Sequence, residues 1–273
     1  MKCIKKISVF LLTFLLVGCG ETATPTETTQ VLETTVATEP VETTTVNDDV
    51  VTNQQDLAAA LKFSNHVVLG CDIQLTAGVE LSKGALSGNG YQLLAPTYNE
   101  DDAETNASIF LISGNVENIS LIGGNRGMST DPNHRMLGNI RLNNVKADAH
   151  SALYVGHGDN EHNLDAINCQ FYGKTVFSRL AKAYFADCTF GYNSAGTQGC
   201  VWAYRDAHFV NCRFEGLDDA KFDFIIPKEE SSRTVILENC YVGDTLITQE
   251  NLEELLDVNN QGSNTIRVIS DGA

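Results

Sequence analysis

The sequence predicts an all-β domain, a solenoid in which short parallel strands stack in about eight coils. The first observation is a six-residue segment that recurs along the body of the chain with Asn or Asp at its centre, often followed by Cys. The second is an alternation of apolar and polar residues on both sides of that centre, which is typical of strands that bury one face. The third is that helices of regular length between the segments are missing, which disfavours leucine-rich repeats.

Residues 1–18 have the organisation of a signal peptide. Three lysines lie within the first six residues and precede an apolar run of about eleven residues, which is too short to span a bilayer. The segment ends in Leu-Val-Gly-Cys at 16–19, which resembles the lipobox of bacterial lipoproteins. The resemblance implies cleavage before Cys19, lipidation of this cysteine with a diacylglycerol and an acyl chain such as palmitate, and an extracytoplasmic protein anchored in the cell membrane. An ordinary secretory leader that contains a cysteine is the alternative.

Residues 19–52 comprise the cysteine to be lipidated and a Thr/Glu-rich tether. Between positions 21 and 52 the chain has 12 Thr, seven Asp or Glu, no Lys or Arg and no aromatic residue. Such a composition buries too little apolar area to offset the entropy of ordering the backbone, so we expect a disordered, extended segment. It would hold the following domain, residues 53–273, away from the membrane.

The body of the chain repeats a bend flanked by two short strands. Four copies have Asn-Cys or Asp-Cys at the bend, and two earlier copies lack the Cys. They lie at 116–121, 142–147, 166–171, 185–190, 209–214 and 237–242. Weaker copies surround Gly70 and Asn89, and successive bends are 19 to 29 residues apart.

Asn and Asp suit these bends because they tolerate the left-handed backbone conformation and hydrogen-bond to nearby backbone. In units stacked about 4.8 Å apart, their side chains can also bond to one another along the stack. The sequence therefore predicts a structural ladder of Asn118, Asn144, Asn168, Asp187, Asn211 and Asn239.

A third strand is expected between successive bends, at 108–112, 152–155, 175–178, 200–204 and 222–226. Three strands per coil with an asparagine stack at one bend resembles the right-handed parallel β-helix of the pectin-lyase-like superfamily. The resemblance covers most of the domain and implies that fold. Short capping helices are expected from Asn53 to Leu61 and after Thr248, where an amphipathic helix includes Leu252, Leu255 and Leu256. A last strand at 265–269 is expected to close the coil.

The cysteines of the body are expected to pack in the core. They share one inward position beside a column of phenylalanines, and a free cysteine behaves as a small buried hydrophobe. A disulfide between neighbouring coils and a metal or redox role are the alternatives. The residues concerned are Cys169, Cys188, Cys212 and Cys240, beside Phe171, Phe190 and Phe214.

The chain is acidic, with a formal net charge of −17. Binding to nucleic acid depends on Lys and Arg that displace the counterions of the phosphates. The charge therefore excludes nucleic acid as a partner, and it also disfavours docking on anionic lipid by a basic patch.

The resemblance raises the expectation of polysaccharide chemistry, but a fold does not assign a function. Polygalacturonases of the superfamily carry Asn-Thr-Asp, Asp-Asp, His-Gly and Arg-Ile-Lys motifs. Here Asp218-Asp219 follows His157-Gly158, which reverses the family order, and the other two motifs are missing. The hydrolase assignment therefore fails. For a lyase, whose base is an arginine in pectate lyases, the only candidates are Arg179 and Arg205 at the ends of third strands.

Two sets of residues are candidates for binding an extended ligand. Arg179 and Arg205, with Tyr204 beside them, offer bidentate contact to a uronate carboxylate and a stacking face for a sugar ring. A column three residues before each bend faces outward and includes Tyr184 and His208, together with Arg141 and Asp165. In both cases an ordinary solvated surface is the alternative.

Two further groups contain metal-ligating residue types. His157 and Asp159, with Glu161 and His162, follow a third strand in a Gly-rich segment. Carboxylates at three other positions provide hard oxygen ligands for calcium, the one cofactor that the sequence suggests. These positions are Asp218, Asp219 and Asp223. Solvated loops are the alternative for both groups.

We therefore expect a surface-anchored lipoprotein whose β-helix binds or scaffolds an extended ligand, preferably a cell-surface or plant-type polysaccharide, and requires no cofactor. Two alternatives stay open. One is a pectate-like polysaccharide lyase that acts by calcium-assisted β-elimination. The other is a module for protein interaction or surface assembly.

Overall fold

The computed structural model of the chain describes residues 49–96, 106–194, 199–216, 221–228 and 231–270. They belong to the compact unit that runs from Thr45 to Ala273. The predicted signal peptide, Cys19 and the tether up to residue 48 lie outside the described residues, as do Asp218 and Asp219.

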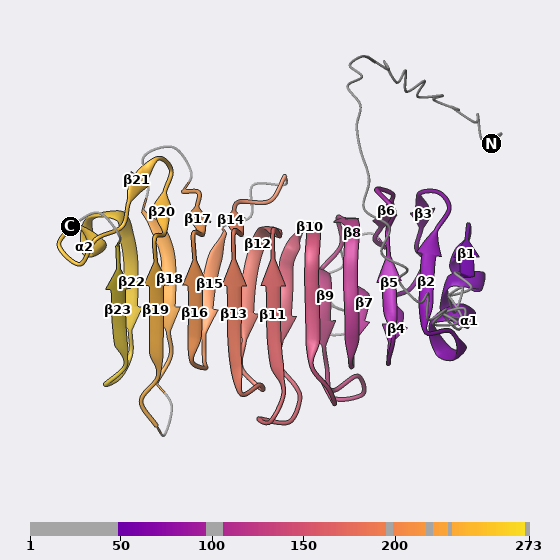
Figure 1. Cartoon of the computed structure of the whole chain (residues 1–273), viewed down its shortest axis with the longest axis horizontal. Coiled ribbons are helices and arrows are strands. Elements are labelled where there is room, and N and C mark those ends of the chain that lie inside the picture. The colour runs from indigo at the N-terminus through magenta and orange to yellow at the C-terminus, as the bar shows by residue number, and fades with distance from the viewer. Residues whose placement is uncertain (1–48, 97–105, 195–198, 217–220, 229–230, 271–273) are drawn as a thin grey trace, which may run out of the picture. The chain divides into compact units, whose positions relative to one another are not determined.

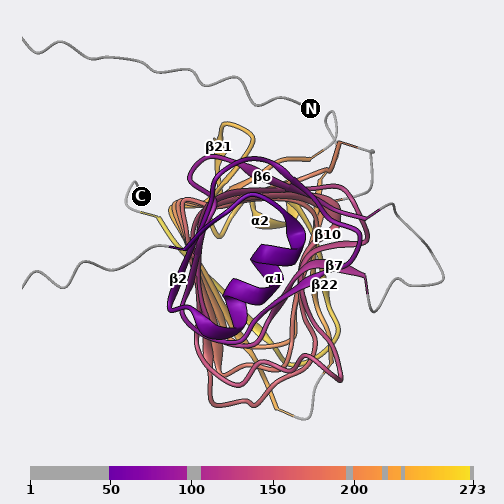
Figure 2. The same ribbon diagram turned by 90° about the vertical axis from the view of Figure 1, so that its right-hand side faces the viewer.

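The described residues form mostly β structure, with 23 strands in one hydrogen-bonded, largely parallel sheet that curls around a buried core (Figures 1 and 2). In Figure 1 the strands progress along the long axis from β1 at the right to β23 at the left. The first strands are β1 (Asp49–Val51), β2 (His66–Leu69), β3 (Ile73–Gln74), β4 (Val79–Leu81), β5 (Ala85–Ser87), β6 (Gln92–Leu94), β7 (Ala107–Leu111) and β8 (Gly114–Ile122). The middle strands are β9 (Arg126–Thr130), β10 (Ile140–Val155), β11 (Asn163–Ile167), β12 (Gln170–Phe177), β13 (Lys182–Ala186), β14 (Thr189–Gly191), β15 (Cys200–Ala203) and β16 (Ala207–Val210). The last strands are β17 (Arg213–Phe214), β18 (Phe222–Ile226), β19 (Thr234–Glu238), β20 (Tyr241–Val242), β21 (Thr245–Leu246), β22 (Leu256–Asn260) and β23 (Thr265–Ile269).

Most strands of the middle and C-terminal region pair in parallel with a strand that comes two to four strands later, and this pattern sorts the strands into rows. The first row, which we name the β13 row, runs β10, β11, β13, β16, β19 and β23. The second, the β15 row, runs β9, the C-terminal half of β10, β12, β15, β18 and β22. Side chains that point away from the core on each row form a separate outer face.

The predicted bends coincide with a left-handed backbone. The bend residues from Asn89 to Asn239 all have φ between 50° and 54°, whereas Gly70 does not share this conformation. Two ladder hydrogen bonds are present: Asn144 Nδ2 donates to Asn118 Oδ1 at 2.9 Å, and Asn211 Nδ2 donates to Asp187 Oδ1 at 3.1 Å.

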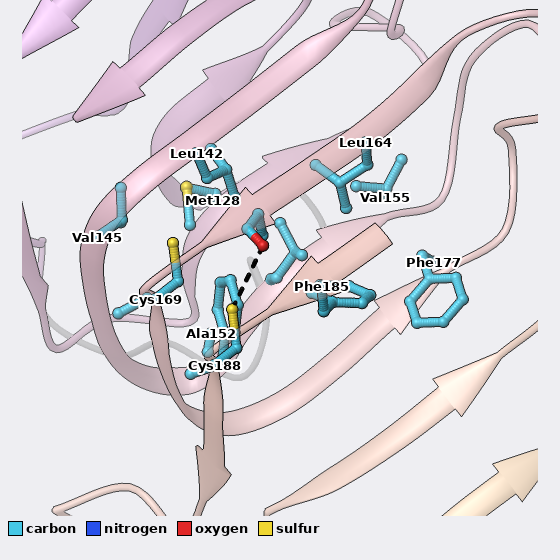
Figure 3. Close-up of a cluster of buried hydrophobic side chains, with 14 of the residues drawn as sticks. Met128, Leu142, Val145, Ala152, Val155, Leu164, Cys169, Phe177, Phe185 and Cys188 are labelled. Atoms are coloured by element: carbon cyan, nitrogen blue, oxygen red, sulfur yellow. Dashed lines mark hydrogen bonds between the residues drawn. The ribbon is translucent and has the colours of Figure 1, made fainter. Parts of the chain in front are cut away.

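The core contains stacked phenylalanines and buried thiols. Phe190 stacks on Phe171 and on Phe214, each with 5.4 Å between ring centroids. The six cysteines of the described ranges are free, and those of the predicted column are buried. Figure 3 shows Cys169 and Cys188 among apolar side chains; the dashed line is the bond from Cys188 Sγ to the carbonyl oxygen of Ala166, at 3.5 Å.

A helix lies at each end of the stack of strands. In α1 (Gln54–Phe63), Asn53 is the N-cap and its side chain accepts a hydrogen bond from the backbone N–H of Asp56. The helix buries Leu57 and Leu61 against the first strands, and Figure 2 shows it across that end. The second helix, α2 (Leu252–Leu255), is a single turn. No helix within the described ranges is long and apolar enough to cross a membrane.

Three sequence predictions about the elements are wrong. Residues 49–51, assigned to the disordered tether, form β1, because Val51 is buried and the segment pairs with β2. The C-terminal helix was expected to include Leu256, but this residue begins β22, which pairs with β18. The expected strands at 152–155 and 175–178 are not separate, because β10 and β12 each continue from the strand that follows the bend into the third strand without interruption.

Candidate functional site

A cleft of about 570 Å³ lies on the outer face of the β15 row. Register places Tyr154 of β10 beside Val176 of β12, and Val176 beside Trp202 of β15, so these outward side chains form a continuous strip. Lys174 occupies the next outward position of β12. The complete lining is Asn125, Arg126, His150, Ser151, Tyr154, Gly156, Lys174, Val176, Ser178, Arg179, Trp202, Tyr204 and Arg205.

A second hollow of about 540 Å³ adjoins this cleft, and Arg179 and Arg205 line both. It adds the guanidinium of Arg233 and the polar side chains of Asn160 and Ser231. We name the two hollows together the cationic cleft.

The charged side chains that line the cationic cleft are all basic: Arg126, Lys174, Arg179, Arg205 and Arg233. No Asp or Glu of the described residues lines either hollow. The chain as a whole has 35 Asp and Glu but 18 Lys and Arg, so the charge of the cleft lining is opposite in sign to the net charge of the protein. A concave surface with charges of one sign concentrates the electrostatic field and attracts counter-ions.

Arg126 forms the inner wall of the cleft. It is 7% exposed, and its Nη1 donates to Ser129 Oγ at 3.0 Å. Its guanidinium lies 3.7 Å from the centroid of the Tyr154 ring. This cation–π contact holds the guanidinium against the ring of Tyr154, and both side chains line the cleft.

The outer arginines donate hydrogen bonds to neutral oxygens. Arg233 Nε donates to the carbonyl oxygen of Tyr204 at 3.1 Å, and its Nη1 donates to Ser231 Oγ at 2.8 Å. Arg205 contacts the same carbonyl through Nη1 and Asn160 Oδ1 through Nη2, both at 3.4 Å. These contacts hold the guanidinium groups of Arg205 and Arg233 in place at the cleft.

Aromatic rings complete the cleft. The rings of Trp202 and Tyr204 have centroids 6.2 Å apart and an interplanar angle of 35°. With Tyr154 they give apolar ring faces beside the basic groups. Such a surface can accommodate a flat, partly apolar ligand that also carries negative charge.

The comparisons with known proteins leave the family open. No family model matches the chain, and no curated protein sequence matches it. Among solved structures, the chain is similar to one named L. reuteri 53608 SRRP, with 12% sequence identity. The match covers 81% of this chain and 99% of that chain, with a TM-score of 0.34. So distant a similarity transfers neither a function nor a site.

The structure brings together some of the predicted site residues. Arg179, Tyr204 and Arg205 lie in the cationic cleft, as described above. Tyr184 and His208 lie on the β13 row, beside each other in register and apart from this cleft. The predicted binding residues therefore divide between two outer faces.

Among the predicted metal-ligating residues, those that the structure describes form no metal site. Asp159 forms an ion pair with Arg135 at 3.0 Å, and the backbone N–H of His157 donates to Thr130 Oγ1. Asp223 lies beside Asp257 in register; burial and the charge of Asp257 raise the pKa of Asp223. Across the described residues there is no group of three or more His, Cys, Asp or Glu side chains that could hold a metal. Asp218 and Asp219 lie outside the described residues, so the calcium site that the sequence suggested stays a prediction.

Sequence reasoning did not identify Arg126, Tyr154, Lys174, Trp202 or Arg233. A signal was present for Trp202, since it alternates with Tyr204 and is the one tryptophan of the chain. The other four come from three different strands and a loop, and only the register of the strands brings them together.

Proposed function

We propose that the chain is a surface-anchored binding protein whose cationic cleft holds an extended acidic polysaccharide without altering it. The observation that supports this most directly is the cleft's lining, where five basic side chains and no carboxylate of the described residues face the ligand space. Arginine binds a uronate carboxylate through two parallel hydrogen bonds, and aromatic rings stack on the apolar face of a sugar.

The polysaccharide lies along the direction in which the strands stack. Arg179 and Arg205 follow the neighbouring strands β12 and β15, so they are separated by one strand spacing, about 4.8 Å. An extended chain with one carboxylate on each sugar can therefore meet one arginine after another. A single small anion would use only part of the cleft.

In this proposal the curled sheet is a right-handed parallel β-helix of about eight coils, with α1 and α2 over its ends. The parallel pairing of each strand with one about a coil later supports it. The chain is attached to the membrane through the lipidated Cys19 and a tether that ends before β1, and these hold the cleft away from the membrane surface.

Calorimetric titration with polygalacturonate tests the proposed function. We expect saturable binding to the intact protein that weakens as salt is raised, since exposed charges are screened within about 10 Å at 0.1 M salt. Arg205→Ala should lower the affinity by roughly tenfold, because one charge-assisted contact contributes about 1.5 kcal/mol. The matched control is Lys62→Ala, which removes an exposed cation of α1 and should leave the affinity unchanged. Absence of binding, or an equal loss in both variants, contradicts the proposal.

A second candidate function is cleavage of the same polysaccharide by β-elimination. Two arginines at the end of the cleft, Arg179 and Arg205, favour it. The base would remove the proton α to the carboxylate, a carbon–carbon double bond would form, and the glycosidic bond would break, with the leaving oxygen taking a proton from solvent. Incubation with polygalacturonate and calcium would then produce an ultraviolet-absorbing unsaturated product. If the intact protein forms this product, and if Arg179→Ala or Arg205→Ala abolishes its formation, then the protein is a lyase and the binding-only proposal is wrong.

A further inference from the structure

A hollow of about 910 Å³ lies on the other outer face, along five neighbouring strands of the β13 row. Its lining is Arg141, Leu142, Asn143, Asp165, Ile167, Lys182, Ala183, Tyr184, Asp206, Ala207, His208, Thr234 and Ile236. None of these residues lines the cationic cleft. We name this hollow the β13 groove.

The floor of the β13 groove is a row of outward side chains in direct register. Tyr184 of β13 pairs with His208 of β16, and His208 pairs with Ile236 of β19. The rings of Tyr184 and His208 meet edge to face, with centroids 5.6 Å apart and an interplanar angle of 78°. The imidazole is fixed on its other side, since Nε2 lies 2.8 Å from Glu238 Oε2. The aromatic floor is therefore preorganised.

The wall of the groove is apolar on a surface that normally favours polar groups. Ile167 of β11 is 42% exposed and lines the hollow. Ile236 of β19 also lines the hollow. Apolar side chains beside an aromatic ring, open to solvent, are suited to the apolar face of a ligand.

The charges of the groove balance, in contrast to those of the cationic cleft. Its lining contains two basic side chains, Arg141 and Lys182, and two acidic ones, Asp165 and Asp206. Arg141 and Asp165 are directly opposite each other on β10 and β11. Such a rim offers both donors and acceptors to a ligand but gives no net attraction to an anion or a cation.

We propose that the β13 groove binds a neutral saccharide chain, which lies across the strands with one sugar face on Tyr184. A neutral sugar matches what the groove presents: an apolar ring face for Tyr184 and Ile167, and hydroxyl groups that both donate to Asp165 and Asp206 and accept from Arg141 and Lys182. The chain would thus have two separate saccharide-binding faces, one for acidic and one for neutral chains. This inference does not depend on the function proposed for the cationic cleft.

Saturation-transfer NMR and calorimetry with four neutral hexasaccharides (cellohexaose, xylohexaose, mannohexaose and maltohexaose) test the inference on the intact protein. We expect at least one to bind, and Tyr184→Ala to weaken that binding by about tenfold or more, which corresponds to about 1.4 kcal/mol. Tyr184→Phe should retain binding, because it keeps the ring. The matched control is Tyr172→Ala, which removes a half-buried tyrosine of β12 outside both sites.

Fluorescence separates this site from the cationic cleft. Trp202 is the one tryptophan of the chain and lines the cleft, so a hexasaccharide in the β13 groove should leave its emission unchanged. Binding of none of the four sugars overturns the inference. Binding of a neutral sugar that survives Tyr184→Ala also overturns the inference. A preference of the groove for polygalacturonate or for an apolar peptide over every neutral sugar overturns it as well.

Discussion

Arg179 and Arg205 occupy equivalent positions on neighbouring strands, each two residues beyond the directly paired Phe177 and Ala203. The ladder of parallel hydrogen bonds continues past this pair, since the backbone N–H of Tyr204 donates to the carbonyl oxygen of Phe177 at 3.1 Å. Both arginines line both parts of the cationic cleft. The stacking of strands thus places two basic groups side by side that are 26 positions apart in the sequence.

Lys174→Ala and Lys182→Ala form a matched pair that tests which face binds an acidic polysaccharide. Both lysines are outward residues of neighbouring elements, but Lys174 lines the cationic cleft and Lys182 lines the β13 groove. We expect Lys174→Ala to weaken polygalacturonate binding by roughly two- to fivefold, because an exposed charge contact contributes up to about 1 kcal/mol. Lys182→Ala should have no effect. Titration calorimetry at low salt measures the affinity of both variants. A larger loss of affinity in Lys182→Ala would contradict the proposal, because the polyanion would then bind in the β13 groove.

Asn144 tests the ladder at the bends. Its φ is 53°, and its side chain donates to Asn118. Asn144→Ala removes the hydrogen bond. It also places alanine, which tolerates the left-handed region less well than asparagine, at this bend, at a cost of about 1–2 kcal/mol. Asn144→Gly removes only the bond, because glycine accepts this conformation. Urea unfolding should therefore show the Ala variant to be less stable than the Gly variant, and equal stabilities would mean that the backbone conformation contributes little.

Phe190 tests the stacked aromatic core. Its ring contacts Phe171, Phe185, Phe209 and Phe214, all within 5.5 Å between centroids. We expect Phe190→Ala to lower the free energy of unfolding by about 3–5 kcal/mol, as for other buried phenylalanines. Phe190→Leu fills most of the volume and should lose clearly less. A loss below about 1 kcal/mol in the Ala variant would contradict the packing described here.

Because Asp223 lies beside Asp257, we expect the stability of the fold to depend on pH. Burial, together with the negative charge of Asp257, raises the pKa of Asp223 from its ordinary value of 3.8. A carboxyl with a raised pKa in the folded state stabilises the fold below the unfolded pKa, and that contribution is lost as pH rises through the folded value. Asp257→Asn removes the repulsion, so it should raise Tm at neutral pH, and the gain should shrink toward zero below about pH 3.8. A gain of equal size at both pH values would show that charge repulsion is not its cause.

The repeating part of the fold could be predicted because each coil repeats the same local physics. Asn or Asp at a left-handed bend, with apolar residues at fixed positions on both sides, identifies the bends from Asn89 to Asn239. The ends of the domain could not be predicted in the same way. The strand β1 and the start of β22 at Leu256 depend on pairing with β2 and β18, and no local pattern marks them.

The candidate site could be predicted only in part. Arg179, Tyr204 and Arg205 stand out because they follow apolar strands, but the sequence does not show which side chains face outward there. The register between β10 and β12 shifts near Ser151, so the residues that flank Tyr154 cannot be aligned by counting from the bends. Arg126 reaches the cleft from β9, whose pairing with β10 places it beside Ser151.

The emission of Trp202 during titration with polygalacturonate tests the central claim most directly, because the one tryptophan of the chain lines the cationic cleft. We predict a saturable change in emission for the intact protein, a curve displaced to higher concentration by salt, and loss of the response in a variant that combines Arg179→Ala with Arg205→Ala. Binding of the polyanion without any change at Trp202, or an undiminished response in the double variant, would contradict the cationic cleft as the site.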